Sequence, residues 1–308
     1  MRAVTVTQAP GSRLPVRRGR SPDLPGVAAA AVLVLLSATL VAQPQFPRAA
    51  WNEPQKPFRV FGNTYWVGTH GLGSVLITSD AGHVLIDGAL PESVPQITGS
   101  IRTLGFKVED VKLIVNSHVH FDHAGGISEL QRLSGARVVA SPSTAAALMA
   151  GASGPDDPQF GIVDPIARVA SVATLTDGET LRVGPLAMTA HLTPGHTPGG
   201  TSWSWRSCES ARCVDLVYAD SLNPISNDRF KYTSSPLLRG FETSYAALEA
   251  LPCDILLTPH PGFSEAFEKL AARDAGKADA FIDPGACKRY VAAGRKNLAA
   301  RVATEAKP

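Results

Sequence analysis

The stretch HVHFDH, residues 118–123, decides the fold of this chain of 308 residues. It follows an apolar segment, residues 112–116, that predicts a short buried strand. Side chains alternate at a strand end, so His118 and His120 can point the same way, and the turn that follows can bring Asp122 and His123 alongside. Imidazole and carboxylate groups together are typical of a zinc site. Three histidines so close together would be costly to bury without a metal or a charged partner.

Two more histidines lie in distinctive surroundings. His196 belongs to TPGHTPGG, residues 193–200, where prolines and glycines fix the loop. His260 belongs to TPHPG, residues 258–262, just after a predicted strand. Strand ends and the loops beyond them are the usual location of a site on an α/β scaffold. Either histidine alone could be structural, but together with residues 118–123 they indicate a metal site.

The hydrophobic pattern around these segments predicts an α/β fold. The order is β-rich and then alternating, twice over, which favours two similar halves with sheets packed face to face and helices outside. The Pro-rich segment 44–57 is expected to be an extended arm. Residues 151–165, rich in Gly, Pro and Asp, are expected to form a loop, which either lines the site with Gln159 and Phe160 or is an ordinary surface loop. We expect strands at about 58–61, 64–67, 74–78, 83–87, 112–116, 137–140, 181–183, 186–192, 201–205, 216–219 and 255–258, and helices at about 94–104, 124–133, 143–150, 241–251, 264–275 and 284–305.

The first residues resemble a targeting signal. A basic stretch that ends at Arg20 precedes an apolar run of 16 residues, 27–42, which is short for a membrane span of roughly 20 residues. We expect a signal peptide over 1–42, an arm over 43–57 and a single domain over 58–308. The protein would then be periplasmic or secreted, with no stable membrane association after cleavage. An uncleaved membrane anchor and a twin-arginine signal at Arg17-Arg18 are the alternatives.

Cysteines and charge are consistent with export and exclude one class of partner. The four cysteines allow three pairings, and Cys208 with Cys213 could close a small hairpin-like loop, which leaves Cys253 with Cys287. Free buried thiols are the alternative. The net charge is +2, but residues 1–42 contribute +4, so the remainder has a net charge of −2. We therefore expect no nucleic-acid partner.

The order of these segments resembles the metallo-β-lactamase superfamily. The pattern is His-x-His-x-Asp-His, a Gly-flanked histidine, an Asp-containing segment and a C-terminal histidine, over most of residues 58–262. The resemblance implies an αββα sandwich, in which two packed mixed sheets have helices outside and the metals at their edges. It also implies two zinc ions per chain. His118, His120 and His196 would bind one ion, and Asp122, His123 and His260 would bind the other.

Two segments narrow the resemblance to one branch. YADSLNP, residues 218–224, and TPHPG, residues 258–262, resemble subclass B3 metallo-β-lactamases, which have serine where subclass B1 uses a cysteine ligand. The resemblance implies hydrolysis of the β-lactam amide bond of penicillins, cephalosporins and carbapenems by a hydroxide that bridges the metals, and hence antibiotic resistance. Asp122 would be catalytic by orienting that hydroxide. Ser221 and Asn223 would contact the carboxylate of the small-molecule substrate. Asn223 departs from the usual small hydroxyl residue, but an amide can still donate a hydrogen bond.

Asp220 leaves an alternative open. Lactonases and the glyoxalase II group have a metal-bridging aspartate in a similar setting, so a secreted dizinc lactonase or thioester hydrolase remains the rival function. We expect Asp220 to contact a metal ligand instead of a metal. A flavodiiron-type oxidoreductase would usually have Glu in place of His120. A non-catalytic zinc-binding protein would be expected to have an incomplete ligand set, whereas this set is complete.

Overall fold

The first sheet has seven strands that lie in chain order. The computed structural model describes residues 46–307, so the expected signal segment lies outside the described residues. The first four strands are joined by short connections and pair antiparallel. Each of the next three strands pairs parallel with the strand before it, because a helical connection returns the chain to the same end of the sheet. The strands are β1 (Phe58–Phe61), β2 (Thr64–Trp66), β3 (Val75–Ile77), β4 (His83–Ile86), β5 (Val111–Val115), β6 (Arg137–Ala140) and β7 (Val172–Thr174).

The second sheet has five strands in the order β12-β11-β10-β9-β8. Its strands pair antiparallel except for β12, which pairs parallel with β11 after the chain has crossed over through helix α6 (Leu237–Ala250). The strands are β8 (Thr180–Val183), β9 (Leu186–Leu192), β10 (Thr201–Glu209), β11 (Arg212–Tyr218) and β12 (Ile255–Leu257).

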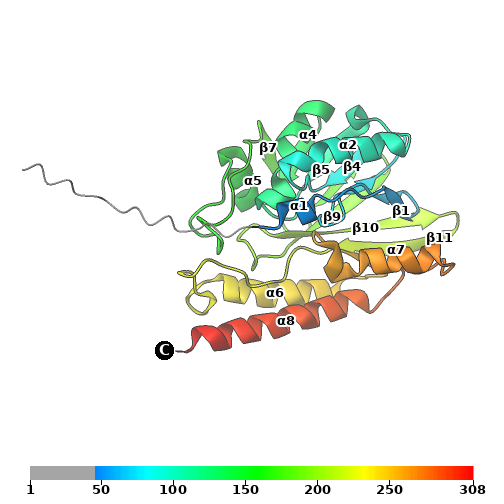
Figure 1. The fold of residues 1–308 in the computed structure, drawn as a ribbon. Coiled ribbons are helices and arrows are strands. Elements are labelled where there is room, and N and C mark those ends of the chain that lie inside the picture. Colours follow the sequence, from blue (N-terminus) through cyan, green and yellow to red (C-terminus); the bar gives the residue numbers. More distant parts are fainter. Residues whose placement is uncertain (1–45, 308) are drawn as a thin grey trace, which may run out of the picture. The chain divides into compact units, whose positions relative to one another are not determined.

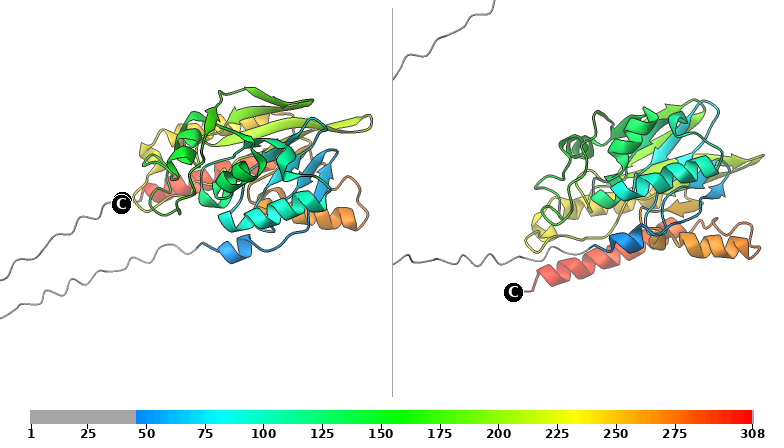
Figure 2. Two further views of the ribbon diagram at one scale, coloured as in Figure 1. Left: turned by 90° about the horizontal axis from the view of Figure 1, so that it is seen from above. Right: turned by 45° about the horizontal axis from the view of Figure 1, so that its top comes forward.

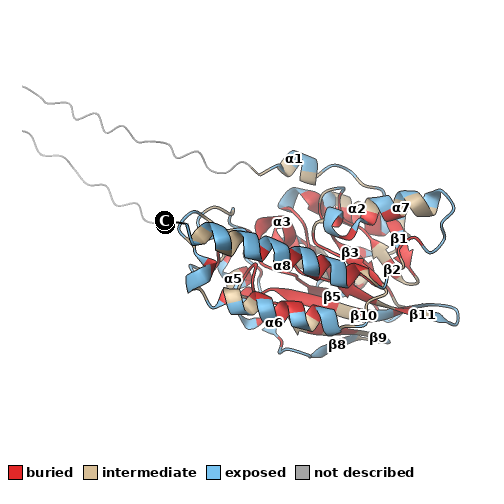
Figure 3. Cartoon of the chain, turned by 90° about the horizontal axis from the view of Figure 1, so that it is seen from below, coloured by how far each residue is buried: buried red, intermediate tan, exposed pale blue. Residues whose placement is uncertain are grey.

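The two sheets pack face to face and helices cover their outer faces (Figures 1 and 2). Alternation along the strands explains this arrangement: Leu85 faces the helical layer, whereas its neighbour Ile86 faces the second sheet. The side chain of Trp203 on β10 extends from the second sheet to the first, where its Nε1 donates to the carbonyl of Asn116 over 3.1 Å. The layers confirm the predicted αββα sandwich. Figure 3 shows red strands between helices whose outer sides are exposed.

Helices of both layers bury one apolar side against a sheet. The first sheet is covered by α2 (Val94–Thr103), α4 (Ile127–Ser134) and α5 (Pro142–Ala150), and the second by α6 and α8 (Ala286–Glu305). The remaining helices are α1 (Arg48–Trp51), α3 (Phe121–Ala124) and α7 (Ala266–Asp274), with 3₁₀ turns η1 (Pro91–Ser93), η2 (Val108–Asp110), η3 (Tyr232–Ser234) and η4 (Pro261–Ser264). Within residues 46–307, none of the helices has the length and apolar character of a membrane span.

Three local expectations were wrong. The arm expected to be extended contains the short helix α1. The helix expected over 124–133 begins only at Ile127, as α4, because the two glycines before it form a break after α3, where the N–H of Gly126 donates to the carbonyl of Ala89 over 3.2 Å. Strands β10 and β11 continue beyond the predicted ends into an exposed hairpin whose residues are too polar to show an apolar alternation.

Both expected disulfides are present. Cys208 and Cys213 face each other across the β10–β11 hairpin, and Cys253 is joined to Cys287 at the start of α8. These two bonds use all four cysteines of the sequence, so none of them is a free thiol. The second bond ties the C-terminal helix to the segment just before β12, the edge strand whose other end leads to His260.

Candidate metal centre and active site

All six ligand candidates lie at strand ends on the same side of the sandwich. His118 and His120 follow β5, and α3, which begins at Phe121, directs Asp122 and His123 to the same place. His196 comes from the turn between β9 and β10, and His260 comes directly after β12. Three segments that are far apart in the sequence therefore meet at one point, as the resemblance implied.

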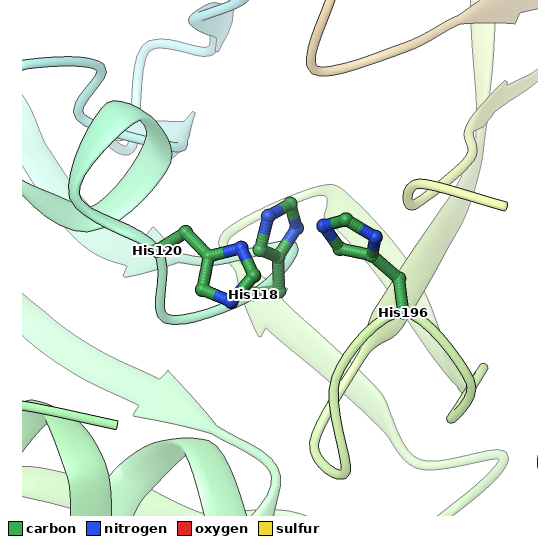
Figure 4. A group of neighbouring side chains, drawn as sticks. All are labelled: His118, His120 and His196. Atoms are coloured by element: carbon green, nitrogen blue, oxygen red, sulfur yellow. The ribbon is translucent and has the colours of Figure 1, made fainter. Parts of the chain in front are cut away.

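Three histidines form the first group. The ligand atoms of His118, His120 and His196 lie within 4.8 Å of one another, and all three side chains are buried. Figure 4 shows the three rings turned toward a common point. Ring centroids are separated by 4.7 to 5.0 Å, with the rings nearly perpendicular. Such a cluster would repel itself if the rings were protonated, so it favours neutral imidazoles.

Each ring of this group has one nitrogen bound to an oxygen behind it. Nδ1 of His118 donates to Oδ1 of Asp220 over 2.7 Å, and Nδ1 of His196 donates to the carbonyl of Asn223 over 2.7 Å. Nε2 of His120 lies 3.1 Å from both carboxylate oxygens of Asp157. These bonds fix the tautomer, so that the opposite nitrogen of each ring presents a lone pair to the centre.

The lone pairs at the centre fit a cation. Nε2 of His118 is buried without a hydrogen-bond partner, which a native structure rarely tolerates unless another group binds there. Burial and the neighbouring histidines lower the pKa of His118 well below its usual value, and lower the pKa of His196 to about 3. Both rings are therefore neutral at physiological pH. Three convergent imidazoles are a donor set that zinc takes in catalytic sites.

The second group combines a carboxylate with two histidines. Oδ2 of Asp122 lies 3.2 Å from Nε2 of His123 and 3.3 Å from Nε2 of His260. Burial alone would raise the pKa of Asp122, but His123 and His260 hold that pKa well below its usual value, so the carboxylate is ionised. The side chain of His260 is 26% exposed, which opens this group to solvent on one side.

A cavity of about 390 Å³ lies over both groups. All six ligand candidates line it, together with Gln159, Ser221 and Asn223. Apolar side chains from five parts of the chain contribute to its walls: Phe46, Trp51, Phe121, Val163, Ile225 and Phe263. A larger cavity of about 700 Å³ lies at the other ends of β4 and β5, around His83, and none of the six candidates lines it. The site is therefore the smaller cavity at the carboxyl ends of the strands, where α/β sheets usually bind ligands.

The predicted substrate contacts occupy one side of this cavity. Ser221 is buried, and Asn223 is partly exposed. The side-chain oxygen of Asn223 accepts a hydrogen bond from Nδ2 of Asn297 on α8 over 2.9 Å. The amide group of Asn223 is thereby oriented by a residue that the sequence analysis did not identify. The roles of Ser221 and Asn223 toward a substrate stay predictions.

Two other parts of the site were missed or left open by the sequence. Trp51 of helix α1 has its ring 5.4 Å from that of His260, and Asp157 approaches His120, although neither residue stands in a recognisable motif. Gln159, named as a candidate, lines the cavity, and its amide nitrogen lies 3.3 Å from Nδ1 of His120 and 3.4 Å from Nε2 of His196. Phe160, named with it, is 48% exposed.

Comparisons with known proteins agree with this geometry. Residues 73–270 match the family model described as the metallo-beta-lactamase superfamily. The solved structure of the Rm3 metallo-beta-lactamase is 51% identical, with a TM-score of 0.84, over 86% of this chain and 100% of that chain. MEM-A1, a subclass B3 metallo-beta-lactamase isolated from a soil metagenome library, is 50% identical, with a TM-score of 0.81, over 83% of this chain and 98% of that one.

Curated relatives match more weakly. A hydroxyacylglutathione hydrolase of Bradyrhizobium sp. (strain ORS 278) is 28% identical over 129 residues, which is 42% of this chain and 41% of that protein. The chain thus spans less than half the length of this curated relative.

Proposed function

The chain belongs to the metallo-β-lactamase superfamily and is similar to its subclass B3 enzymes, and from this premise we propose that it uses two zinc ions to hydrolyse the amide bond of β-lactam antibiotics. Penicillins, cephalosporins and carbapenems would be its substrates, and their inactivation would give antibiotic resistance. The observation that supports this choice within the superfamily is the position of Asp220. Its carboxylate is hydrogen-bonded to Nδ1 of His118, on the side of the ring away from the centre.

The first zinc ion would be held by His118, His120 and His196, and the second by Asp122, His123 and His260. Zinc bound there would lower the pKa of a water molecule to about 7 and polarise the carbonyl of the substrate. The burial of the first group, and of Asp122 and His123 in the second, supports this role, because charges act more strongly where water is excluded. Neutral rings of His118 and His196 and an ionised Asp122 are the protonation states that metal binding needs.

The chain's own side chains would place the substrate and the attacking water. Hydrolysis adds water across the amide bond: the carbonyl carbon gains the oxygen, the C–N bond breaks, and the ring nitrogen gains a proton. Asp122, ionised and facing the cavity, would accept a hydrogen bond from the attacking water and orient it. Ser221 and Asn223 would donate hydrogen bonds to the substrate carboxylate, and the apolar walls would exclude other water.

A thioester hydrolase or lactonase is the second candidate, because a curated relative is named as a hydroxyacylglutathione hydrolase. That function would be favoured if Asp220 bridged the two metals. In this chain Oδ1 of Asp220 is engaged by His118, and its backbone N–H donates to Oγ of Ser202 over 2.9 Å, which holds the residue behind the ligands. The position of Asp220 therefore supports the β-lactam proposal.

Export would place the enzyme where it meets antibiotics. We infer a periplasmic or secreted location from the expected signal segment together with two disulfides, which form and persist in oxidising compartments. Reducing cytosol would keep these cysteines as thiols. The location can be tested by cell fractionation and by N-terminal sequencing of the mature protein.

Turnover assays distinguish the two candidate functions. Purified protein is incubated with a penicillin, a carbapenem, a homoserine lactone and a hydroxyacylglutathione thioester, each with and without a zinc chelator. Loss of the β-lactam rings that the chelator abolishes, with the lactone and the thioester unchanged, is the expected result. Opening of the lactone or cleavage of the thioester, with inert β-lactams, would overturn the proposal in favour of the alternative.

A further inference from the structure

The loop that follows α5 reaches into the back of the first histidine group. Asp157 belongs to the segment 151–165, which the sequence presents as a loop rich in Gly, Pro and Asp. Its side chain is nevertheless buried, with 2% exposure, and both carboxylate oxygens lie 3.1 Å from Nε2 of His120. A carboxylate so deeply buried is costly unless it has a partner, and His120 is that partner.

Several hydrogen bonds hold Asp157 in this place. The backbone N–H of Gln159 donates to Oδ1 of Asp157 over 2.8 Å, and the N–H of Asp157 donates to the carbonyl of Gly154 over 3.0 Å. Asn227, on the segment that precedes α6, binds the loop from the other side: its N–H donates to the carbonyl of Pro158 and its Nδ2 to the carbonyl of Phe160. The loop is thus tied to the rest of the domain just where it touches His120.

We propose that Asp157 is a positioning residue that commits His120 to bind its metal through Nδ1, and that it thereby makes loop 151–165 a part of the metal site. An imidazole ring can present either nitrogen, and the one that binds a metal is set by the bond that the other makes. The proposal rests on the proposed function only in that the first histidine group binds zinc. It does not depend on the identity of the substrate.

The same contact couples the loop to the metal. Because the ion would hold His120 and His120 would hold Asp157, loading of the site would also order the loop, and ordering of the loop would strengthen metal binding by the same factor. Gln159, two residues further on, lies over Nδ1 of His120 and would move with the loop.

The variants Asp157→Ala and Asp157→Asn test the proposal, with Asp156→Asn as the matched control. Asp156 is the exposed neighbour on the same loop, so its substitution removes a charge without touching His120. Zinc affinity is measured by competition with a chromophoric chelator, and the tautomer of His120 by long-range ¹H–¹⁵N spectra of the zinc-loaded protein. We expect Asp157→Ala to lower one of the two zinc affinities about 10- to 100-fold, Asp157→Asn to lower it less, and Asp156→Asn to leave it unchanged.

The spectra separate positioning from general stability. In the unaltered protein we expect the proton of His120 on Nε2, and in Asp157→Ala a loss of that single form. Amide hydrogen exchange of residues 151–165 should slow on zinc binding in the unaltered protein and change less in Asp157→Ala. Unaltered zinc affinity and an unaltered His120 tautomer in Asp157→Ala would overturn the proposal. If that variant does not fold, Asp157→Asn, which keeps the size of the side chain, decides by the same readouts. Zinc binding is measured without substrate, so inert β-lactams would refute the proposed function and leave this inference standing.

Discussion

The guanidinium group of Arg48 lies 2.7 Å from the carboxylate of Asp164, which is 116 residues further along the chain. Its other nitrogens donate to Glu92 over 3.0 and 2.8 Å, and its carbon lies 5.0 Å from the centre of the Phe121 ring. One side chain therefore fastens helix α1, which contains Trp51, to the end of loop 151–165. Both segments are walls of the cavity over the metal groups.

Arg48→Ala should loosen these two walls. Exposed ion pairs are worth about 0.2–1 kcal/mol each, so we expect the KM for a β-lactam to rise about five-fold while kcat changes little. Steady-state kinetics measure the change. Arg132→Ala is the control, because Arg132 forms a similar pair of bonds with Glu129 but does not line the cavity. Equal KM values in the two variants would contradict this role of Arg48.

Asp220→Ala should weaken zinc binding without abolishing it. If the carboxylate only holds His118, its loss leaves all six ligands and lowers the affinity about 10- to 100-fold. Elemental analysis at saturating zinc should still give two ions per chain. Asp215→Ala, in strand β11, which ends two residues before Asp220, is the control. A drop to one ion per chain even at saturation would instead show that Asp220 is itself a metal ligand.

Removal of the Cys253–Cys287 bond should destabilise the protein more than removal of the Cys208–Cys213 bond. The first closes a segment with a sequence separation of 34 and the second one of only 5, so the entropy model gives about 4 and about 2 kcal/mol. Urea unfolding of the two double-alanine variants measures the difference. We also expect the variant without the Cys253–Cys287 bond to lose activity at a lower urea concentration, since Tyr290 on α8 donates to the carbonyl of Asp220 over 3.0 Å. Equal destabilisation would refute the loop-length argument.

Glu305 should make stability depend on pH in the acid range. Burial alone would raise its pKa, but hydrogen bonds from Thr233, Tyr232 and Arg301 lower the pKa to about 2 from 4.5. A lowered pKa contributes stability that is complete above about 4.5 and is lost as the pH falls toward 2. Glu305→Gln should therefore cost about 1–3 kcal/mol at pH 7.

The difference between Glu305→Gln and the unaltered protein should shrink as the pH falls from 4.5 toward 2. Urea unfolding of the zinc-free protein at several pH values measures it, since zinc binding would otherwise add its own pH dependence. The control is Glu249→Gln. The side chain of Glu249 is 42% exposed, and its ion pair is with Arg295. A difference that does not change with pH would rule out the carboxylate of Glu305 as its source.

The αββα layers and the grouping of the candidate ligands were implied by a family resemblance, and the motifs that carry this resemblance lie in short contiguous segments. Residues 118–123 follow a buried strand, and the nearly continuous apolar runs of β4 and β5 indicate a sheet that is covered on both faces. Asp157 could not be predicted in the same way. Its burial depends on how a loop without periodicity folds back on His120, and such tertiary contacts leave no trace in the spacing of residues.

The N-terminal arm gives the same lesson. Its prolines favour an extended chain, but Phe46 and Trp51 pack against Phe121, with ring centroids 5.0 and 6.2 Å away, and this packing stabilises the single turn of α1. The contact between Asp220 and His118, 2.7 Å long, likewise joins residues that are far apart in the sequence. Local sequence preferences predict the helices and strands. Contacts between distant residues determine which side chains, such as Asp157 and Asp220, hold the candidate ligands.

Each group of ligand candidates draws on both sheets. His118 and His120 follow a strand of the first sheet and His196 precedes one of the second; Asp122 and His123 belong with the first sheet and His260 with the second. A metal ion at either position would act as a crosslink between the two halves of the sandwich. The halves could not separate without releasing their ions. The release of free zinc during denaturation would therefore coincide with the separation of the two sheets.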